Sequence, residues 1–387
     1  MSRSENPKAV LIVAGEASGD IHGANLVREL KKKLPHLEFF GIGGDRMEEE
    51  GVDIVHHVRE MSFLGFFEVL EHLPFVRRVL WEMVTLLEQR KPNLVLLIDY
   101  PGFNLRFAKE AKRHGLPVLY YISPQIWAWG RGRIKKIARR VDRMVVIFPF
   151  EEELYRKEGM DVRFVGHPLK DVVRVDRSKK TFFAELGLDT KKPTVGMLPG
   201  SRNQEVQRLL PEMRKAYDLL QERIDGLQAI LGMAPTLSDE AYKPFFNAED
   251  AICAVRNRTY EVMAHSDVVM VASGTATLEA ALLGTPMVIL YKMSRFSFII
   301  GKALVRVRNF GLVNIVAERE VVPELLQGEV NKKRIAQEVL RLFADPERRE
   351  KVERDLKDVS RRLGKKGASE RAAEAVLEFM EQFDLSG

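Results

Sequence analysis

The feature that most constrains the fold is a series of short, almost uninterrupted apolar runs separated by helical patterns. Strands that are apolar along their whole length fit parallel sheets covered on both faces, because neither face meets water. Amphipathic patterns lie between the runs, including 19–33, 103–114 and 131–140. The first half of the chain therefore predicts a doubly wound α/β domain. Its runs are AVLIVA, EFFGI, LVLLID, PVLYYI, RMVVIF and VRFV, at 9–14, 38–42, 94–99, 117–122, 143–148 and 162–165.

The alternation stops and begins again in the middle of the chain. A stretch of turn and charged residues at 166–180, GHPLKDVVRVDRSKK, is typical of a domain boundary. We therefore predict two Rossmann-like domains, 1–168 and 169–345, with a ligand cleft between them at the carboxyl ends of the strands. A charged helical tail, 346–387, is expected to pack back on the first domain or on a partner chain. The second series of runs lies at 194–199, 227–232, 251–255, 268–272 and 286–291.

The composition indicates a globular protein. The 387 residues are 45% hydrophobic and 30% charged, and no apolar run is long enough to cross a bilayer. The N-terminal residues lack a signal-peptide pattern, and Cys253 is the only cysteine, which excludes a disulfide framework and a thiolate metal site. We therefore expect a cytoplasmic protein. The net charge of +6 fits an anionic partner such as phosphate, nucleic acid or an acidic membrane, and a chance basic surface equally well.

Small-residue turns follow three of the predicted strands and are candidate phosphate sites. A glycine turn that leads into a helix exposes backbone N–H groups and the positive end of the helix dipole, although the same glycines can serve tight turns alone. The sequence lacks a P-loop, and GIGGDR fails the dinucleotide fingerprint because Arg46 holds its last position, so a P-loop NTPase and an ordinary dehydrogenase are disfavoured. Two such turns in the second domain, one carrying Arg202, favour a diphosphate. The candidate residues are Gly15 and Ser18 in VAGEASGD, Gly200, Ser201 and Arg202 in LPGSRNQE, and Ser273, Gly274 and Thr275 in ASGTATLE.

One carboxylate stands in the apolar helix that follows the third turn. Glu279 could complete a capping box, although its spacing of four from Thr275 fits that motif imperfectly. Alternatively, Glu279 accepts hydrogen bonds from two ribose hydroxyls, a task that suits a group with acceptors only. A phosphate at 274–277 and a ribose at Glu279 would describe a nucleoside diphosphate lying along one helix.

Four motifs in this order, AGEASGD, SPQIWAWG, LPGSRNQE and SGTATLEAALLGTPMV, resemble those of the lipid-A-disaccharide synthases, over roughly residues 8–380. The resemblance implies a GT-B fold and an inverting glycosyltransferase. Such an enzyme moves 2,3-diacylglucosamine from its UDP conjugate to the 6-hydroxyl of 2,3-diacylglucosamine 1-phosphate (lipid X). The products are a β-1,6-linked disaccharide 1-phosphate and UDP.

The resemblance also implies where the substrates bind. It assigns the acceptor to the first domain and UDP to the second. A UDP-sugar epimerase on the same scaffold, or a non-catalytic nucleotide-binding protein at the membrane, stays open as an alternative. The residues implied around the donor are Ser201, Arg202, Gly274, Thr275 and Glu279, with Asn314 and Gln327 nearby.

Inverting glycosyl transfer needs a base for the acceptor proton and positive charge for the leaving diphosphate. Asp99, at the end of the strongest apolar run, is the candidate base, with a plain turn aspartate as the alternative. Asp20 and His22 in GDIHGAN form a competing pair, and His167 is a further candidate. Arg202 is the candidate cation. Because no two aspartates are separated by one residue, we expect no metal and no other cofactor.

Two stretches carry more apolar side chains than one helix face can bury. In 61–80 the surplus is Leu64, Val69 and Phe75 beside two arginines, and 294–310 has a similar pattern. Apolar groups beside cations fit an interfacial element, whereas a homodimer interface is the rival explanation. We expect a peripheral protein on the cytoplasmic face of the inner membrane, held through 61–80, with 294–310 as a second candidate.

A tryptophan pair and a basic stretch lie next to each other. Trp127 and Trp129 could stack on a sugar, although core packing is the commoner role. The six cations of 130–140 could meet lipid headgroups or the acceptor phosphate, and a plain solvated helix face explains them equally well. No aromatic-rich basic module accompanies them, so we expect no nucleic-acid partner.

Overall fold

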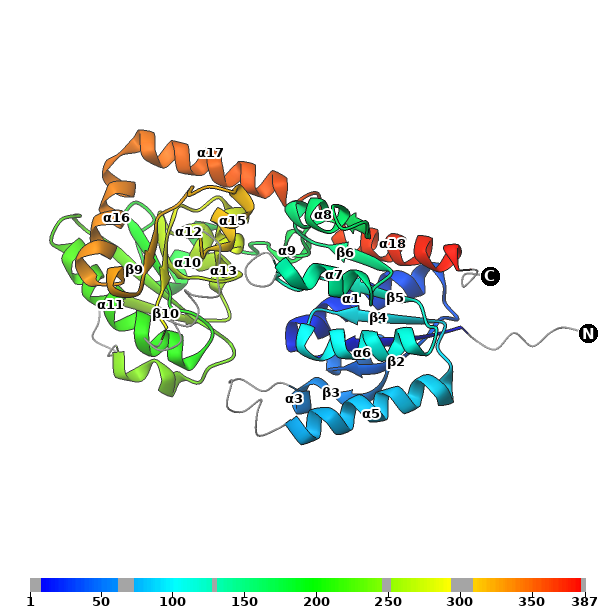
Figure 1. Cartoon of the computed structure of the whole chain (residues 1–387). Coiled ribbons are helices and arrows are strands. Elements are labelled where there is room, and N and C mark those ends of the chain that lie inside the picture. Colours follow the sequence, from blue (N-terminus) through cyan, green and yellow to red (C-terminus); the bar gives the residue numbers. More distant parts are fainter. Residues whose placement is uncertain (1–7, 62–72, 127–130, 246–251, 294–308, 384–387) are drawn as a thin grey trace, which may run out of the picture. The chain divides into compact units, whose positions relative to one another are not determined.

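The structure is a computed structural model that describes residues 8–61, 73–126, 131–245, 252–293 and 309–383. The chain forms two compact units (Figure 1). Unit 1 consists of Met1–Asp171 together with Gly364–Gly387, and unit 2 is Val172–Leu363. In the part of the chain that is described, no helix is long and apolar enough to cross a membrane.

Unit 1 is built on a seven-stranded parallel sheet in the order β3-β2-β1-β4-β5-β6-β7. The chain moves outward from β1 to β3 and then returns to place β4 on the other side of β1, so the strand order reverses between β1 and β4. Ligands in such sheets bind outside the strand ends at this reversal. The strands are β1 (Ala9–Ala14), β2 (Glu38–Gly43), β3 (Asp53–His57), β4 (Leu94–Ile98), β5 (Val118–Tyr121), β6 (Arg143–Val146) and β7 (Asp161–Phe164).

The helices of unit 1 cover both faces of its sheet. Apolar side chains of α5, α6 and α7 share one core with the sheet, whereas α1 packs against α18. Amphipathic spacing forms these helices, and proline at the start of α6 suits a first turn that needs no N–H partner. They are α1 (Ala17–Lys33), α2 (Asp45–Glu49), α3 (Val58–Met61), α5 (Leu73–Arg90), α6 (Pro101–Arg113), α7 (Ile134–Ala138), α8 (Pro149–Arg156), α9 (Leu169–Val172) and α18 (Ala368–Gln382), with a 3₁₀ turn η1 (Arg131–Arg133).

Unit 2 repeats the design with six parallel strands in the order β10-β9-β8-β11-β12-β13. Its order reverses between β8 and β11, and both strands are fully buried. The prediction of two doubly wound α/β domains is therefore confirmed. The strands are β8 (Thr194–Leu198), β9 (Gln228–Met233), β10 (Ile252–Arg256), β11 (Val268–Ala272), β12 (Met287–Tyr291) and β13 (Glu324–Leu326).

The helices of unit 2 include the longest of the described helices, α11. They are α10 (Lys179–Leu186), α11 (Asn203–Gln221), α12 (Thr259–His265), α13 (Ala276–Leu283), α15 (Leu312–Ala317), α16 (Lys332–Ala344) and α17 (Pro346–Arg362), with 3₁₀ turns η2 (Asp239–Ala241), η3 (Lys243–Phe245) and η4 (Gln327–Glu329).

The helical tail is divided between the two units. Helix α17 packs on α13, α15 and α16 of unit 2, and α18 returns to unit 1. There α18 meets Arg143, whose side chain is 1% exposed. The Arg143 guanidinium donates to the carbonyl oxygen of Ala375 (2.9 Å) and to Asp161 (2.6 Å), and it lies over the ring of Phe379. A buried cation with all these partners ties α18 to the sheet.

Candidate functional site

The reversal point of unit 1 brings Gly15 and Asp99 together. Ala14 at the end of β1 pairs with Ile98 at the end of β4, and the two candidate residues come directly after them. A side chain at Gly15 would put its Cβ 2.1 Å from the ring of Tyr100, so only glycine lets that ring lie against the backbone. Ser18, also expected at this site, is exposed in the first turn of α1.

The Asp99 carboxyl is partly buried and has an altered proton affinity. Its pKa is raised from 3.8 to about 6, mainly by burial and also by the nearby Glu16 carboxylate, whereas the N–H of Tyr100 opposes the change. A base whose pKa lies near neutrality is both deprotonated and strong enough to accept a proton at pH 7. Glu16, the exposed N-cap of α1, was not predicted as a site residue, although it stands directly after Gly15 in the AGEASGD motif.

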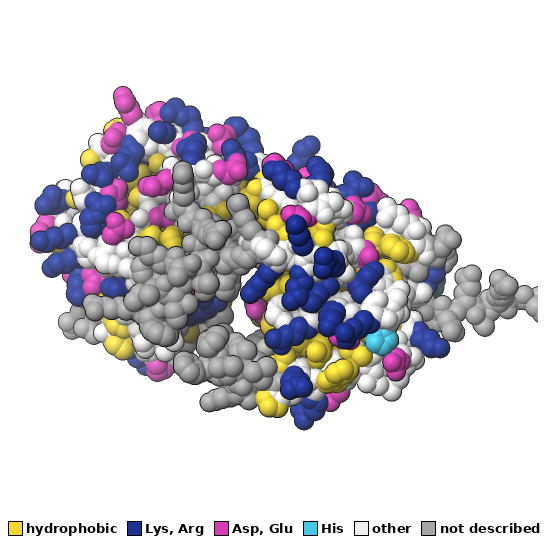
Figure 2. All heavy atoms as spheres, in the orientation of Figure 1, with side chains coloured by type: hydrophobic (Ala, Val, Ile, Leu, Met, Phe, Trp, Pro, Cys, Tyr) yellow, Lys and Arg dark blue, Asp and Glu magenta, His cyan; other side chains and the backbone are white. Residues whose placement is uncertain are grey.

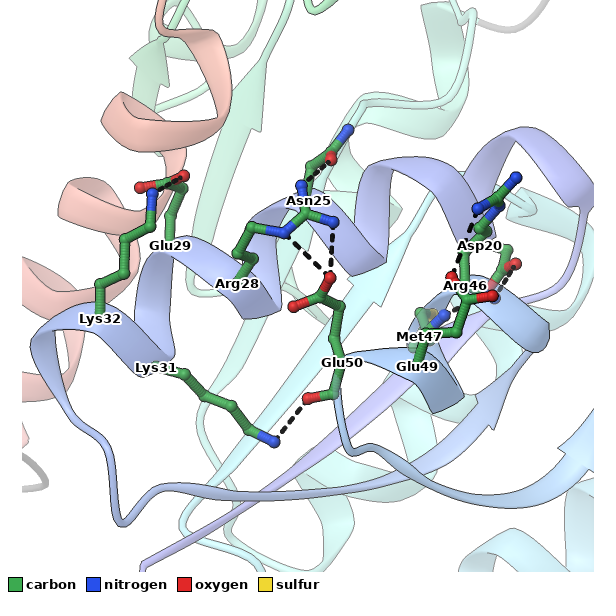
Figure 3. A network of polar contacts seen from close by, with 10 residues as sticks. All are labelled: Asp20, Asn25, Arg28, Glu29, Lys31, Lys32, Arg46, Met47, Glu49 and Glu50. Atoms are coloured by element: carbon green, nitrogen blue, oxygen red, sulfur yellow. Dashed lines mark hydrogen bonds and ion pairs between the residues drawn. The ribbon is translucent and has the colours of Figure 1, made fainter.

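Asp20, expected as a competing base, is occupied elsewhere. It is 6% exposed, and its carboxylate accepts hydrogen bonds from the N–H groups of Arg46 (3.1 Å) and Met47 (3.1 Å) (Figure 3) and from that of Gly44 (2.7 Å). These are the N–H groups at the start of α2, which lack partners within that helix. Asp20 therefore fastens α2 to α1, and we do not propose it as a base.

His22 lies close to His167 in a buried environment. Burial lowers the pKa of His22 to about 4 and that of His167 to about 3, and the His22 imidazole contributes to the lowered pKa of His167. The Nδ1 atom of His167 accepts from the N–H of Leu169 (3.2 Å), and its ring packs on Phe148. Both imidazoles are neutral at pH 7 and are weaker bases than Asp99, so Asp99 remains our candidate.

The first turn of unit 2 presents an exposed cation. The Arg202 side chain is 73% exposed, and its Nη1 lies 3.7 Å from a Glu205 carboxylate oxygen. The other Glu205 oxygen accepts from the N–H groups of Ser201 (3.0 Å) and Arg202 (3.3 Å), which caps α11. Gly200 has a left-handed φ of 112°, and a Cβ there would strike Glu205 at 2.2 Å. Glu205 thus takes two N–H groups that we expected to hold phosphate, and the guanidinium is the group left to bind one.

The second turn of unit 2 stands at the start of α13. Ser273 donates its hydroxyl to the carbonyl of Phe310 (3.0 Å), and Thr277 donates to the carbonyl of Gly274 (2.8 Å). Gly274 has a φ of 154°, and apart from Gly274 and its two chain neighbours no atom of the described residues lies within 4 Å of the position where a Cβ would stand. Thr275 is exposed and makes no side-chain cap bond. The space beside Gly274 is open to a ligand.

Glu279 does not close the capping box that was its alternative role. Its carboxylate accepts a hydrogen bond from the hydroxyl of Tyr260 on α12 (3.3 Å). Burial raises the pKa of Glu279, and the bond from Tyr260 partly offsets that effect. A half-buried carboxylate with one protein donor keeps acceptor capacity for further hydroxyl groups.

Asn314 and Gln327 are both expected near the donor, and they differ in how far their side-chain amides are already hydrogen-bonded. The fully buried Asn314 amide donates to the carbonyl of Val322 (2.9 Å) and to Glu324 (2.7 Å), and accepts from Val321 and Val322 N–H groups. Asn314 therefore holds the loop before β13. The Gln327 Nε2 atom is buried and has no partner among the described residues. Because buried donors are normally paired, Gln327 is the better candidate for a ligand contact.

Two further features of the site concern metals and aromatic residues. Within the described ranges, no group of three or more His, Cys, Asp or Glu side chains is placed to hold a metal ion. Trp127 and Trp129 lie outside the described residues.

Solved structures share this fold at low sequence identity. A putative UDP-N-acetylglucosamine 2-epimerase from Listeria monocytogenes has a TM-score of 0.67 at 14% identity, over 98% of this chain and 97% of that one. The UDP-GlcNAc 2-epimerase from Neisseria meningitidis, bound to UDP-GlcNAc, has a TM-score of 0.65 at 13% identity, over 96% and 100%. The calicheamicin glycosyltransferase CalG4 has a TM-score of 0.61 at 16% identity, over 98% and 100%. These likenesses confirm the expected GT-B fold.

Sequence comparison is more specific. Residues 10–379 match the family model described as Lipid-A-disaccharide synthetase. The lipid-A-disaccharide synthase of Syntrophus aciditrophicus is 47% identical over 381 residues, covering 98% of this chain and all of that protein. That of Geobacter metallireducens is 47% identical over 374 residues, covering 96% and 97%, and that of Myxococcus xanthus is 44% identical over 376 residues, covering 97% and 98%. The chain belongs to the lipid-A-disaccharide synthase family.

Proposed function

We propose that this chain is the glycosyltransferase that joins 2,3-diacylglucosamine, taken from its UDP conjugate, to the 6-hydroxyl of 2,3-diacylglucosamine 1-phosphate. The products are the β-1,6-linked disaccharide 1-phosphate and UDP. The observation that carries this conclusion is the family match over nearly the whole chain. The chemistry of the site agrees with it, because Asp99 stands at a strand reversal with a pKa of about 6.

Unit 1 is proposed to activate the acceptor. Asp99 accepts the proton of the 6-hydroxyl as that oxygen attacks the anomeric carbon of the donor. Attack from the face opposite the departing UDP inverts the configuration at that carbon. The Glu16 carboxylate helps to keep the Asp99 carboxyl basic, since it disfavours a second negative charge nearby.

Unit 2 is proposed to bind the UDP part of the donor. The exposed Arg202 guanidinium stabilises the charge that develops on the leaving diphosphate. Gly274 leaves room for a phosphate, Glu279 accepts from ribose hydroxyls, and the unpartnered Gln327 amide donates to the donor. With an arginine in this role, we propose that the reaction uses no metal ion.

A product assay tests the function directly. The purified protein is incubated with both lipid precursors, and the disaccharide 1-phosphate is detected by mass spectrometry while UDP release is measured. Omission of the acceptor is the control. A UDP-sugar epimerase would alter the donor without the acceptor, and a nucleotide-binding protein without activity would release no UDP, so either result would replace our proposal.

We also propose that the protein works at the cytoplasmic face of the inner membrane as a peripheral protein. The segments expected to meet lipid lie largely outside the described residues, at 62–72 and 294–308, and Phe75 packs on the core of unit 1. On α5, however, Trp81 is 60% exposed, and Arg77 and Arg78 nearby are exposed as well.

The distribution of charged side chains also supports membrane binding by unit 1. Figure 2 shows Lys and Arg side chains gathered on the face of unit 1 that α6 and α7 cover. Between residues 100 and 141 the sequence has ten Lys and Arg and a single acidic residue, Glu110. Exposed tryptophan beside cations suits the headgroup region of an anionic bilayer.

Flotation with liposomes that contain anionic lipid tests the membrane proposal. The wild type should float at low salt, and Trp81→Ser and high salt should each reduce the floating fraction. Wild type that stays at the bottom, together with a dimer in light scattering, would instead favour the alternative of a homodimer interface.

A further inference from the structure

Two successive residues at the end of β4 adopt a backbone conformation that side chains disfavour. Asp99 has a φ of 45° and Tyr100 a φ of 47°, and neither is a glycine. The left-handed region costs ~1–2 kcal/mol for each such residue. A pair of this kind persists only where the surrounding structure holds it, and it therefore points to groups that do so.

The groups that hold this turn are Asn104 on α6 and Tyr120 on β5. The amide of Asn104 donates to the carbonyl oxygen of Asp99 (2.7 Å) and to that of Ile98 (3.1 Å). The hydroxyl of Tyr120 donates to the same Asp99 carbonyl oxygen. Asn104 and Tyr120 are both 0% exposed, so water does not replace these bonds.

Other groups of Asp99 and Tyr100 are hydrogen-bonded as well. The Asp99 N–H donates to the carbonyl of Tyr121 (3.0 Å), and the carbonyl of Tyr100 accepts from the Asn104 N–H (3.1 Å). The Tyr100 hydroxyl donates to the carbonyl of Met61 (3.1 Å). Among the described residues, the side chains that donate to the Asp99 carbonyl oxygen are those of Asn104 and Tyr120.

We propose that Asn104 and Tyr120 are positioning residues that fix the direction of the Asp99 carboxylate by clamping its carbonyl oxygen. When a residue rotates about its N–Cα bond, which changes φ, its carbonyl group and its Cα–Cβ bond turn together. Loss of the clamp lets the turn relax toward the commoner β region, and the carboxylate then swings away from the acceptor and out of its buried place near Glu16. This inference rests on the proposed role of Asp99 as the base.

The neighbouring residue on β5 provides a matched control. Tyr121 is also 0% exposed, but its hydroxyl oxygen has no hydrogen-bond partner among the described residues. Tyr120→Phe and Tyr121→Phe each remove one oxygen from the same buried strand, and only the first removes a bond to the turn. A general loss of packing would affect both variants alike.

Kinetics over a pH range form the first test. Tyr120→Phe should lower kcat about tenfold, with KM for both substrates within about twofold, because the base and not substrate binding is affected. The acid limb of its pH profile should move to lower pH, since a solvated carboxylate is a weaker base. Asn104→Ala should act in the same direction, and Tyr121→Phe should match the wild type. Wild-type kcat and pH profile in Tyr120→Phe, or an equal loss in Tyr121→Phe, would overturn the proposal.

A titration of the Asp99 carboxyl group needs no turnover, so it tests the positioning role independently of the proposed function. Aspartate labelled with ¹³C at the carboxyl group is followed by NMR, and the Asp99 signal is the one lost in Asp99→Asn. In Tyr120→Phe its titration should move toward that of an ordinary aspartate, and in Tyr121→Phe it should not. If the wild type makes no disaccharide but the two variants differ in this way, the proposed function is wrong and the positioning role of Tyr120 is supported. An unchanged Asp99 titration in Tyr120→Phe rejects the positioning role.

Discussion

Replacement of Asp99 by asparagine is expected to stabilise unit 1 while it strongly lowers turnover. Burial raises the pKa of the Asp99 carboxyl from 3.8 to about 6, so the folded state holds this proton more tightly than the unfolded chain does. Below both pKa values the carboxyl is neutral in the folded and in the unfolded state, so it does not lower the stability. As the pH rises through them, the folded state must carry a poorly solvated charge. The gap of roughly 2 pH units corresponds to about 3 kcal/mol of lost stability at pH 8, and about half of that at pH 5.

Asparagine keeps the shape of the side chain and removes its charge. Asp99→Asn should therefore raise Tm by several degrees at pH 8 and by less at pH 5, in calorimetric scans of both proteins. Turnover in the product assay should fall by about 100-fold or more, with UDP affinity nearly unchanged. Asp225→Asn, at an exposed aspartate of unit 2, should alter none of these quantities.

Two results would refute this reasoning separately. Equal Tm values for wild type and Asp99→Asn at pH 8 would mean that the folded state does not bury a charged carboxylate at this position. Near-normal turnover in the same variant would remove Asp99 as the base, whatever its effect on stability.

Three further predictions concern other parts of the molecule. Arg202→Ala should weaken UDP binding by about tenfold or more in calorimetric titration and should lower turnover as well, because the guanidinium is the exposed cation of its turn; unchanged values would place the diphosphate elsewhere. Asp20→Ala should lower stability by about 1–3 kcal/mol in thermal unfolding, since it leaves the first N–H groups of α2 without their acceptor, and an unchanged Tm would contradict that role. EDTA should leave disaccharide synthesis intact, and a loss of activity that Mg²⁺ restores would contradict metal-free transfer.

Most of the fold was predictable because its strands are buried on both faces. Continuous apolar runs located the strands nearest the centre of each sheet, such as β4, LVLLI, all of which is buried. The edge strands β3 and β13 were missed, because one is partly exposed along its length and the other has three residues. Neither strand forms a continuous apolar run in the sequence.

The site was less predictable, because motifs show which residues are near a turn but not where their side chains point. Asp20 follows a small-residue turn as Asp99 follows a strand, yet it faces the start of α2, 24 residues away along the chain. Asn314 is likewise bonded within its own loop. Such pairings depend on the packing of elements distant in sequence, and the local sequence does not encode them.

The return of α18 has a consequence for the order in which the protein is made. Unit 2 is one continuous segment, Val172–Leu363, whereas unit 1 lacks α18 until residues 368–382 have left the ribosome. Until then the Arg143 guanidinium has neither the Ala375 carbonyl nor the Phe379 ring, and the side of α1 that α18 covers stays in water. The unit translated first is therefore the one completed last, and a released chain truncated after Leu363 should resist proteolysis in unit 2 but not in unit 1.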